Sequence, residues 1–367
     1  MKNSLCFIIL GLFFQPILAQ EYHSDYFETV ADLGEYMAIG LSVSSDNRVF
    51  VSFPYAEGQP YKYGLTEVID GETVPYPNKK WNIHAGDESK RFVKVQDLFV
   101  DADDFLWVLD SKPSPRGSIF GDSDKSEDGK FKLLKINLAT DEVERVYHFG
   151  ALDKAASGLN DIRIDTDKQL GYLSDPGQAA LVILDLKTGK TRTVLKNVEA
   201  TTANPDVVLS YHGKEMRNKE GKPFSSNVNG IALTSDNKYF YFKPINKLNL
   251  YRIETKFLAD TSFTPTELVK KVEDMGEVGI THGLIADKKG NVYLTNSVDY
   301  AVKYFSPKDG KVHTLVQDSG LLWPDSLGIG SDGYLYFSCS QLQRQPVWNN
   351  GESKVQFPYQ VFRVKLP

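Results

Sequence analysis

The segment TSDNKYFYFKP (residues 234–244) joins a short polar turn to a run of alternating aromatic side chains, and it represents the unit from which the chain is built. Asp, Asn and Ser favour tight turns, whereas alternating Tyr and Phe are typical of a strand. Five other segments have the same form: SSDNRVFVSF (44–53), DADDFLWVLD (101–110), DTDKQLGYLSD (165–175), ADKKGNVYLTN (286–296) and GSDGYLYFSC (330–339). The sequence therefore contains six copies of one structural unit.

The turns of these copies share an acidic position. Five copies carry an Asp there, and the fifth copy in the chain has Lys289 instead, with Asp287 close by. The five acidic residues are Asp46, Asp103, Asp167, Asp236 and Asp332. We expect them to shape turns at one face of the fold.

Each turn is preceded by a second apolar alternation, such as IAL before residue 234 and LIA before residue 287, so each copy predicts an antiparallel hairpin. Stretches such as KLLKINLATDEVERVYHF (132–149) add two more strands to the unit. Six four-stranded antiparallel units predict an all-β chain folded as a six-bladed β-propeller. The last copy has only QVFRVKL (360–366) after its hairpin, so we expect YFETVADL (26–33) to complete that blade and close the ring.

The first residues have the pattern of a secretory signal peptide. Lys2 precedes the apolar run CFIILGLFF, which is too short to span a bilayer, and Ala19 offers a small residue for cleavage. We therefore predict a signal peptide at 1–19, a single propeller domain at 20–367, and a secreted or periplasmic protein. The mature chain would keep only Cys339, so it would fold without an internal disulfide.

The composition narrows the range of partners. The 367 residues are 41% hydrophobic and 25% charged, as in ordinary globular proteins, which excludes a disordered chain and a multi-span membrane protein. With 42 basic and 48 acidic residues the net charge is −6, which would repel nucleic acid phosphates and anionic membrane surfaces. We expect a monomer whose partner is a small molecule rather than a nucleic acid or a membrane.

Several stretches resemble the Yellow and major royal jelly protein family, and the resemblance extends over nearly the whole mature chain. The most specific are GLNDIRID (158–165), NGIALTSDNKYFYFKPI (229–245) and LLWPDSLGIGSDGYLYFSCSQLQ (321–343). The resemblance implies a secreted six-bladed propeller. Some members of this family bind small amines in the central channel, and some relatives carry a dopachrome tautomerase label.

The sequence is also similar, more distantly, to the gluconolactonase and regucalcin propellers, which hold a divalent metal on the axis. Those proteins place a Glu on the first strand of the first blade, just before a Gly. Here that position is Ile39, followed by Gly40. Their metal-binding set is therefore incomplete in this chain.

The repeat alignment predicts a ring of residues at the propeller axis. The residue seven positions before each turn position should begin an inner strand close to the axis. These residues are Ile39, Gln96, Asn160, Asn229, His282 and Asp325. Polar groups in a narrow channel need partners, which can be each other, water, an ion or a ligand.

We predict that a ligand contacts these polar residues and an aromatic residue at the rim. The predicted ligand-binding residues are Gln96, Asn160, Asn229, His282, Trp323 and Asp325. The alternative is a water-filled channel whose lining satisfies its own hydrogen bonds.

The ring also suggests chemistry. His282 and Asp161 are the candidate catalytic residues, because imidazole titrates near neutral pH and a carboxyl group can act as an acid or a base. Their alternative roles are a hydrogen-bonded wall residue and, for Asp161 and Asp97, a tie to a neighbouring loop. Asn160, Asn229 and Asp325 offer oxygen ligands to Ca²⁺ or another divalent cation, although one carboxylate with two amides is a weak set.

Two classes of function remain open. The first is binding of a small aromatic, amine or quinone-like ligand, with a tautomerase-like isomerase as its enzymatic form. The second is a metal-dependent lactone hydrolase similar to gluconolactonase.

Three insertions interrupt the repeat, at 111–130, 196–226 and 343–354. We expect the second to lie over the face that carries the ring. The stretch DSDKSEDGKFKL (122–133) resembles a calcium loop but lacks its central Gly and final Glu, which favours a solvated acidic loop.

Overall fold

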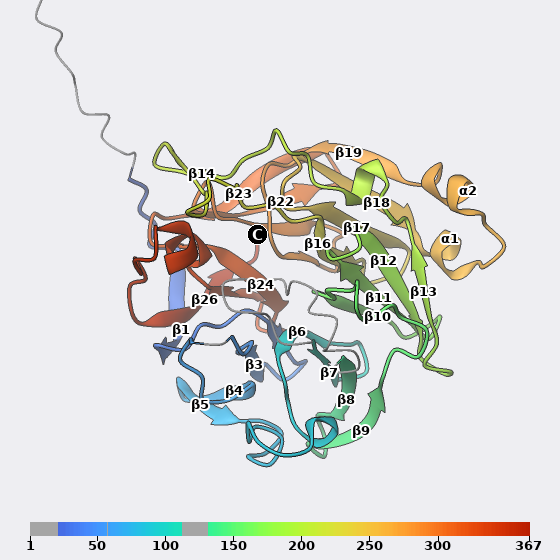
Figure 1. The fold of residues 1–367 in the computed structure, drawn as a ribbon, viewed down its shortest axis with the longest axis horizontal. Coiled ribbons are helices and arrows are strands. Elements are labelled where there is room, and N and C mark those ends of the chain that lie inside the picture. The colour runs from blue at the N-terminus through green and yellow to red at the C-terminus, as the bar shows by residue number, and fades with distance from the viewer. Residues whose placement is uncertain (1–20, 57, 112–130) are drawn as a thin grey trace, which may run out of the picture.

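The computed structural model describes residues 21–56, 58–111 and 131–367. These residues form six four-stranded antiparallel sheets, which we call blades 1 to 6 in chain order. Figure 1 shows the blades arranged around a common centre. The predicted six-bladed β-propeller is confirmed. The signal peptide expected at 1–19 and most of the insertion 111–130 lie outside the described residues, so those expectations stay predictions.

The strands of each blade run outward from the centre. The innermost strands of blades 1 to 6 are β2 (Leu41–Val43), β6 (Val95–Val100), β10 (Ile162–Asp165), β16 (Val228–Leu233), β20 (Leu284–Ala286) and β24 (Pro324–Ile329). The second strands are β3 (Val49–Ser52), β7 (Phe105–Asp110), β11 (Leu170–Asp175), β17 (Tyr239–Pro244), β21 (Val292–Asn296) and β25 (Tyr334–Cys339). The third strands are β4 (Leu65–Ile69), β8 (Lys132–Asn137), β12 (Ala180–Asp185), β18 (Asn249–Glu254), β22 (Ala301–Ser306) and β26 (Tyr359–Lys365). The outermost strands are β5 (Glu72–Pro75), β9 (Glu142–Tyr147), β13 (Thr191–Val194), β19 (Glu273–Glu277), β23 (Lys311–Gln317) and β1 (Phe27–Gly34).

The N-terminal strand closes the ring. β1 pairs antiparallel with β26, the third strand of blade 6, from Phe27 opposite Val364 to Gly34 opposite Tyr359. Ala31 and Leu33 are buried, whereas Asp32 between them and Gly34 after them are exposed. The pairing expected between residues 26–33 and 360–366 is therefore confirmed.

Buried acceptors fix the turns between the first two strands. The carboxylate of Asp101 accepts hydrogen bonds from the backbone N–H of Asp103 at 3.0 Å and from the indole N–H of Trp107 at 2.7 Å. Asp287 accepts the backbone N–H of Lys289 at 2.8 Å in the same way. All six predicted turns are present. In blades 2 and 5 the acceptor stands two residues before the acidic position noted in the sequence, which explains why Lys289 is tolerated there.

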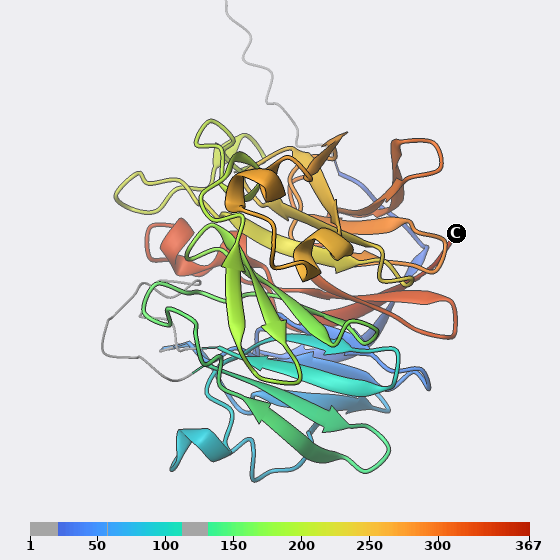
Figure 2. The ribbon, with the colours of Figure 1, turned by 90° about the vertical axis from the view of Figure 1, so that its right-hand side faces the viewer.

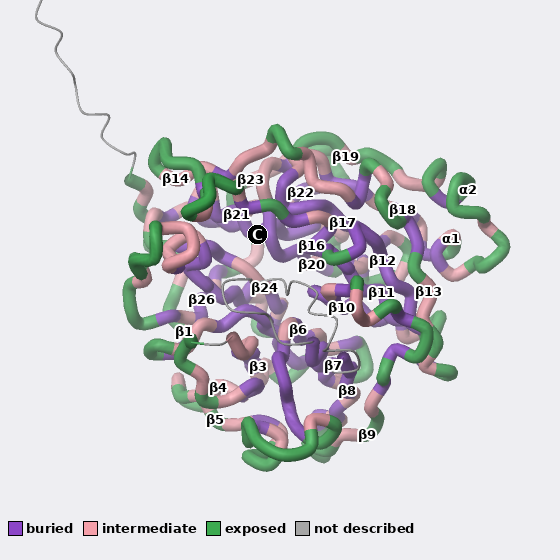
Figure 3. The backbone as a smooth tube through the Cα atoms, in the orientation of Figure 1, coloured by how far each residue is buried: buried purple, intermediate pink, exposed green. Residues whose placement is uncertain are grey.

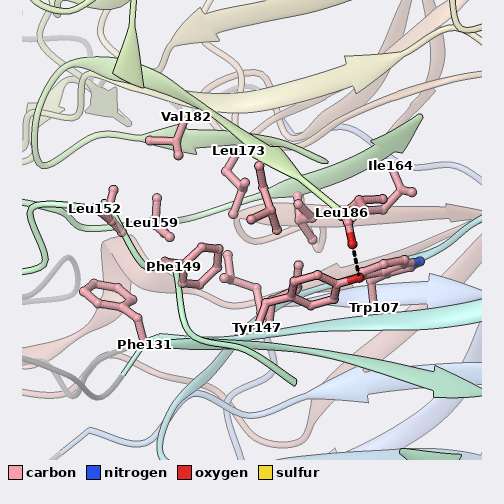
Figure 4. Packing of buried hydrophobic residues seen from close by; sticks show 14 residues of the cluster. Trp107, Phe131, Tyr147, Phe149, Leu152, Leu159, Ile164, Leu173, Val182 and Leu186 are labelled. Atoms are coloured by element: carbon pink, nitrogen blue, oxygen red, sulfur yellow. Dashed lines mark hydrogen bonds between the residues drawn. The ribbon is translucent and has the colours of Figure 1, made fainter. Parts of the chain in front are cut away.

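Apolar side chains fill the space between neighbouring blades. Figure 4 shows fourteen of them between blades 2 and 3, among them Trp107 and Leu173. The Tyr147 hydroxyl, which lies in the same cluster, donates to the carbonyl of Leu186 at 3.1 Å. Figure 3 shows the buried residues concentrated toward the centre and the exposed ones on outer strands and loops. Contact between sheet faces, rather than a separate central core, thus holds the ring together.

The remaining elements are short. Helices α1 (Thr255–Ala259) and α2 (Pro265–Val269) lie on the outer side of blade 4 (Figures 1 and 2). Single 3-10 turns are η1 (Glu88–Lys90), η3 (Glu199–Thr201), η4 (Leu342–Arg344) and η5 (Pro346–Trp348), and β14 (Ser210–Tyr211) pairs with β15 (Lys214–Glu215). Within the described residues no helix has both the length and the apolar character needed to span a membrane. Cys339 is buried with a free thiol.

Ring closure predicts that the N-terminal strand contributes to global stability. Leu33→Ala should lower the free energy of unfolding by about 2–4 kcal/mol, because it removes a buried side chain from the closing strand. Thr29→Ala, on the exposed face of the same strand, should change it by less than about 0.5 kcal/mol. Urea unfolding of both variants measures the difference, and equal midpoints would contradict a structural role for β1.

Candidate functional site

The six aligned residues all reach the axis, as the repeat predicted. Ile39, Gln96, Asn160, Asn229, His282 and Asp325 line a single cavity at the end of the ring where the inner strands begin. A local irregularity of the backbone places them there. In blades 2 and 4 the pairing of the first two strands skips Gln96 and Asn229, and in blade 6 it skips Asp325 with the following Ser326.

The other three blades have the same irregularity in their hydrogen bonds. In blade 1 the carbonyl of Ser52 accepts from Ile39 N–H, while the Ser52 N–H donates to the carbonyl of the next residue, Gly40. Ser174 in blade 3 and Thr295 in blade 5 each serve two consecutive residues of the inner strand in this way. Two residues therefore face one, which is a β-bulge, and bulges re-aim side chains next to functional sites.

A hydroxyl group completes the bulge in these three blades. The side-chain oxygens of Ser52, Ser174 and Thr295 accept the N–H of the second bulge residue at 2.9, 3.1 and 2.8 Å. In blade 4 the matching position is Lys243, which pairs opposite Gly230. Its buried amine donates to the carbonyls of Pro244 and Lys247, and burial lowers its pKa to about 7. The repeat alignment missed this column of residues on the second strands, because they lie six residues after the turn position in blades 1 and 5 but seven residues after it in blades 3 and 4.

Close contact between neighbouring blades explains the glycines that follow the ring residues. A Cβ atom on Gly230 would lie 2.0 Å from the carbonyl oxygen of His282. A Cβ atom on Gly283 would lie 2.2 Å from the carbonyl oxygen of Asp325. Any side chain at these positions would push adjacent blades apart at the axis.

An arginine that was not singled out in the sequence crosses the axis. Arg163, on the inner strand of blade 3, donates to Asp97 Oδ2 in blade 2 at 3.1 Å and to the carbonyl of Leu284 in blade 5 at 2.8 Å. Blades 2 and 5 lie on opposite sides of a six-membered ring, so the guanidinium spans the channel. Arg163 follows Asp161 by two positions along the same strand, which places it deeper along the axis than the cavity.

Asp97 has a structural role. Besides Arg163 it accepts the backbone N–H of Ile162 at 2.9 Å, which ties blade 2 to blade 3. Burial raises the pKa of Asp97 and the charge of Arg163 opposes that rise. Because both side chains are almost fully buried, each charge depends on the other.

The first half of the ring satisfies its own hydrogen bonds. Gln96 Nε2 donates to Asn160 Oδ1 at 3.2 Å, and Asn160 Nδ2 donates to Asp161 Oδ1 at 2.7 Å. Burial, and then the charge of Asp97, raises the pKa of Asp161 well above its usual range. In blades 2 and 3 the polar side chains of the lining therefore satisfy one another's hydrogen bonds, as the alternative without a ligand predicts.

Blades 4 to 6 leave polar groups free at the cavity. No hydrogen bond joins the Asn229 side chain to another described residue. No cationic side chain among the described residues pairs with Asp325, whose carboxylate accepts a hydrogen bond from the Ser340 hydroxyl at 3.3 Å and another from the side chain of Trp323. Burial inside the ring, with a smaller effect from Asp97, raises the pKa of Asp325 to about 7, although the side chain keeps some accessible surface.

His282 is held by a chain of hydrogen bonds. Its Nε2 lies 2.6 Å from Ser297 Oγ, which lies 2.6 Å from the hydroxyl of Tyr211. Its Nδ1 is buried and has no partner among the described residues. Burial lowers the pKa of His282 to about 3, with a further effect from Lys243, so the imidazole is neutral.

The sequence predicts Trp323 at an exposed rim, and this prediction is wrong. Trp323 lines the cavity from a buried position. It is 1% exposed, and its ring stacks on His282 with centroids 4.1 Å apart and planes at 24°. Phe224 and Tyr211 contact it from other sides. Both belong to the insertion 196–226, whose burying effect the repeat alignment could not show.

The insertion lies on the predicted face. Leu209, Met216 and Phe224 pack in one cluster with Trp323 and Leu342, which line the cavity. None of residues 196–226, all of which are described, belongs to the cavity wall itself. The segment therefore supports the wall from behind rather than covering the opening.

The cavity combines apolar and polar surfaces. The space between its walls is about 610 Å³ including the open mouth. Its apolar and aromatic residues are Met37, Ile39, Pro54, Tyr55, Ala56, Ile245, Trp323 and Leu342. Its polar residues are Lys94, Gln96, Asn160, Asp161, Asn229, His282 and Asp325.

The proposed calcium ligands meet at this cavity but fit a divalent cation poorly. Among the described residues no three His, Cys, Asp or Glu side chains come together in a metal-binding group. Asn160 already uses its amide within the protein, and Asp325 is the single carboxylate of the set. Arg163 already places a positive charge on the axis nearby. Calcium binding therefore stays a prediction, and no step below depends on it.

Comparison with known proteins agrees with this architecture. The family model described as major royal jelly protein matches residues 93–366. A gluconolactonase from Xanthomonas campestris has 11% identity and a TM-score of 0.56, with 93% of this chain and 89% of that chain covered. The calcium-binding protein regucalcin from Agrobacterium tumefaciens has 12% identity and a TM-score of 0.53, with 92% of each chain covered.

A streptogramin B lyase structure has 13% identity and a TM-score of 0.54, with 93% of this chain and 98% of that chain covered. At such identities the structural similarity shows the fold alone. No curated protein sequence matches the chain.

The buried ion pair between Arg163 and Asp97 generates a stability prediction. Arg163→Met should lower the free energy of unfolding by about 3–5 kcal/mol, because it leaves Asp97 buried without a cation. Adding Asp97→Asn to that variant should restore part of the loss. Arg363→Met breaks the more exposed pair with Glu28 and serves as the control, with an expected loss of about 1 kcal/mol or less. Equal losses for Arg163→Met and Arg363→Met in urea unfolding would rule out the structural role of the axial pair.

Proposed function

The chain belongs to the major royal jelly protein family, and we propose that it binds a small aromatic amine in the axial cavity. The observation that carries the proposal is Asp325, a carboxyl group deep in the cavity wall that has no cationic partner among the described residues. A bound ammonium group would supply that partner.

The charge argument follows from the position of Asp325. Its pKa of about 7 means that ionisation is unfavourable while the cavity holds no positive charge beside it. A cation within a few ångströms favours the carboxylate and is bound more strongly than in water, because the surroundings are poorly polarisable. The axial arginine does not serve, since Asp97 uses it.

The remainder of the wall suits an aromatic ring. Ile39, Tyr55, Leu342 and Trp323 contribute apolar surface to the cavity wall. Aromatic rings also attract ammonium groups through their faces, by about 0.5–2 kcal/mol. An amine joined to a ring by a short linker therefore matches both parts of the cavity.

His282 adds a contact for an oxygen atom on the ligand. The buried hydroxyl of Tyr211 finds an acceptor for its proton only if it donates to Ser297, and Ser297 then donates to His282 Nε2. The neutral imidazole then carries its proton on Nδ1, the atom without a partner. A phenol, carbonyl or quinone oxygen on the ligand would accept this hydrogen bond.

A tautomerase-like reaction on such a ligand is the second candidate, and Asp325 is the residue that favours it. A general acid–base group works best when its pKa lies near the working pH, which describes Asp325 at about 7. His282, the catalytic candidate from the sequence, has a pKa of about 3 and is poorly suited to that role. The lactonase alternative gains less support, since Ile39 stands where its metal ligand is needed.

Tyramine provides the direct test. Calorimetry should show that tyramine binds and that 2-(4-hydroxyphenyl)ethanol, which lacks the charge, binds at least tenfold more weakly. Asp325→Asn should weaken tyramine binding by about tenfold or more. Asp206→Asn, an exposed change of equal charge in the insertion 196–226, should leave it unaltered. Equal binding of amine and alcohol, or an unaltered Asp325→Asn variant, would refute the proposal.

The pKa of Asp325 also predicts a pH dependence. Below about pH 7 the free carboxyl group is protonated, so binding an ammonium group must release one proton. Tyramine affinity should therefore fall about tenfold for each pH unit below 7 and level off between about pH 7.5 and 8. The slope should vanish in Asp325→Asn. A pH-independent affinity in the wild-type protein would mean that Asp325 does not titrate with the ligand.

A further inference from the structure

A second cavity lies outside the ring, between the β14–β15 hairpin and the 3-10 turns η4 and η5. Its space is about 620 Å³ including the mouth. Two insertions in the repeat form this cavity. Tyr211 and Lys214 belong to 196–226, and Arg344 and Trp348 belong to 343–354. Blade 5 contributes Tyr300. Nothing in the proposed function uses this cavity.

The cavity has an excess of positive charge. No carboxylate pairs with Arg344 or Lys214 among the described residues, and both side chains line the cavity. The nearby acids have other partners. Glu215 pairs with Arg217 at 2.5 Å, and Glu352 pairs with Lys354 at 2.7 Å. Burial lowers the pKa of Arg344, as expected for a guanidinium without a counter-ion.

Two buried polar atoms, both on residues that line this cavity, lack hydrogen-bond partners among the described residues. The indole Nε1 of Trp348 is a donor without an acceptor, and Oε1 of Gln343 is an acceptor without a donor. Leaving such groups unpaired costs about 1–3 kcal/mol each, so buried polar atoms are normally paired with protein, water or a ligand. A donor and an acceptor at one cavity indicate a ligand that carries both kinds of group.

Aromatic side chains supply flat surfaces around the cations. Tyr300 stacks on His212 with centroids 5.4 Å apart, and its hydroxyl lies 2.9 Å from His212 Nε2. Trp348 packs edge to face against Phe224, with centroids 5.6 Å apart. Tyr300 and Trp348 both line the cavity, so a planar ring bound there would find aromatic contacts.

We propose that this second cavity binds a small aromatic carboxylate that carries a hydroxyl group. The carboxylate pairs with Arg344 and Lys214, the ring packs against Tyr300 and Trp348, and the hydroxyl donates to Oε1 of Gln343. The guanidinium fork suits a carboxylate, and the indole N–H adds a further donor. The site thus selects a ligand of opposite charge to the one proposed for the axial cavity.

Calorimetry with 4-hydroxyphenylacetate tests the assignment. We expect binding to the wild-type protein, with affinity reduced about tenfold or more in Arg344→Gln and by a smaller factor in Lys214→Gln. Lys214 is exposed, so that variant tests the charge without disturbing a buried group. Lys219→Gln, an exposed lysine of the same insertion paired with Glu220, is the control and should bind like the wild type. Tyramine binding should be unchanged in Arg344→Gln, which separates the two sites.

Two related probes test the ring and its hydroxyl. Phenylacetate, which lacks the hydroxyl, should bind several-fold more weakly, and inorganic phosphate should bind more weakly still. Phosphate binding as tight as that of the aromatic acid would reduce the cavity to a simple anion site and overturn the aromatic assignment. Absence of binding at millimolar acid, or binding that depends on Asp325 rather than on Arg344 and Lys214, would overturn the proposal as a whole.

Discussion

At the start of every inner strand, two consecutive residues face a single residue of the second strand, and the rest of the site depends on this bulge. It turns the first of the two side chains toward the axis and brings the next residue against the neighbouring blade, which is why Gly230 and Gly283 have no room for a Cβ atom. Ser52, Ser174 and Thr295 satisfy the backbone group that the bulge exposes. The β-bulge, repeated in all six blades, therefore brings neighbouring blades into close contact at the axis and places a ring of side chains around a cavity.

Arg163 gives the two halves of this ring different hydrogen bonding. Its bond to Asp97 occupies one carboxylate of the neighbouring blade, and its bond to Leu284 crosses the axis, so that Arg163 ties blades 2, 3 and 5 together. Gln96, Asn160 and Asp161 satisfy one another beside it. On the opposite side, next to apolar side chains, Asn229 and Nδ1 of His282 have no hydrogen-bond partner among the described residues, and Asp325 has no cationic one. An ammonium-bearing aromatic ligand fits that division, because Asp97 already neutralises Arg163 and Asp325 has no cationic partner among the described residues.

The fold and the ring were predictable because both follow the repeat. A fixed spacing from the turns located all six residues that line the axis, and the N-terminal partner of the last blade followed from a missing strand. Features outside the repeat were not predictable in the same way. Trp323 was expected at a rim, but the insertion 196–226 buries it. Arg163 looked like an ordinary polar residue of a strand, since nothing in one sequence shows that its side chain crosses to blade 5. Lys243 was not predictable from the repeat, because the residues that match it on the second strands do not keep a fixed spacing from the turns.

A crystal structure of the protein soaked with tyramine at about pH 8 tests the central claim most directly. The account predicts ligand density in the axial cavity, with the amine nitrogen within hydrogen-bonding distance of Asp325 and the phenol oxygen close to Nδ1 of His282. It also predicts that Arg163 keeps its contacts with Asp97 and Leu284. An axial cavity that holds only water, or an amine bound away from Asp325, would contradict the account.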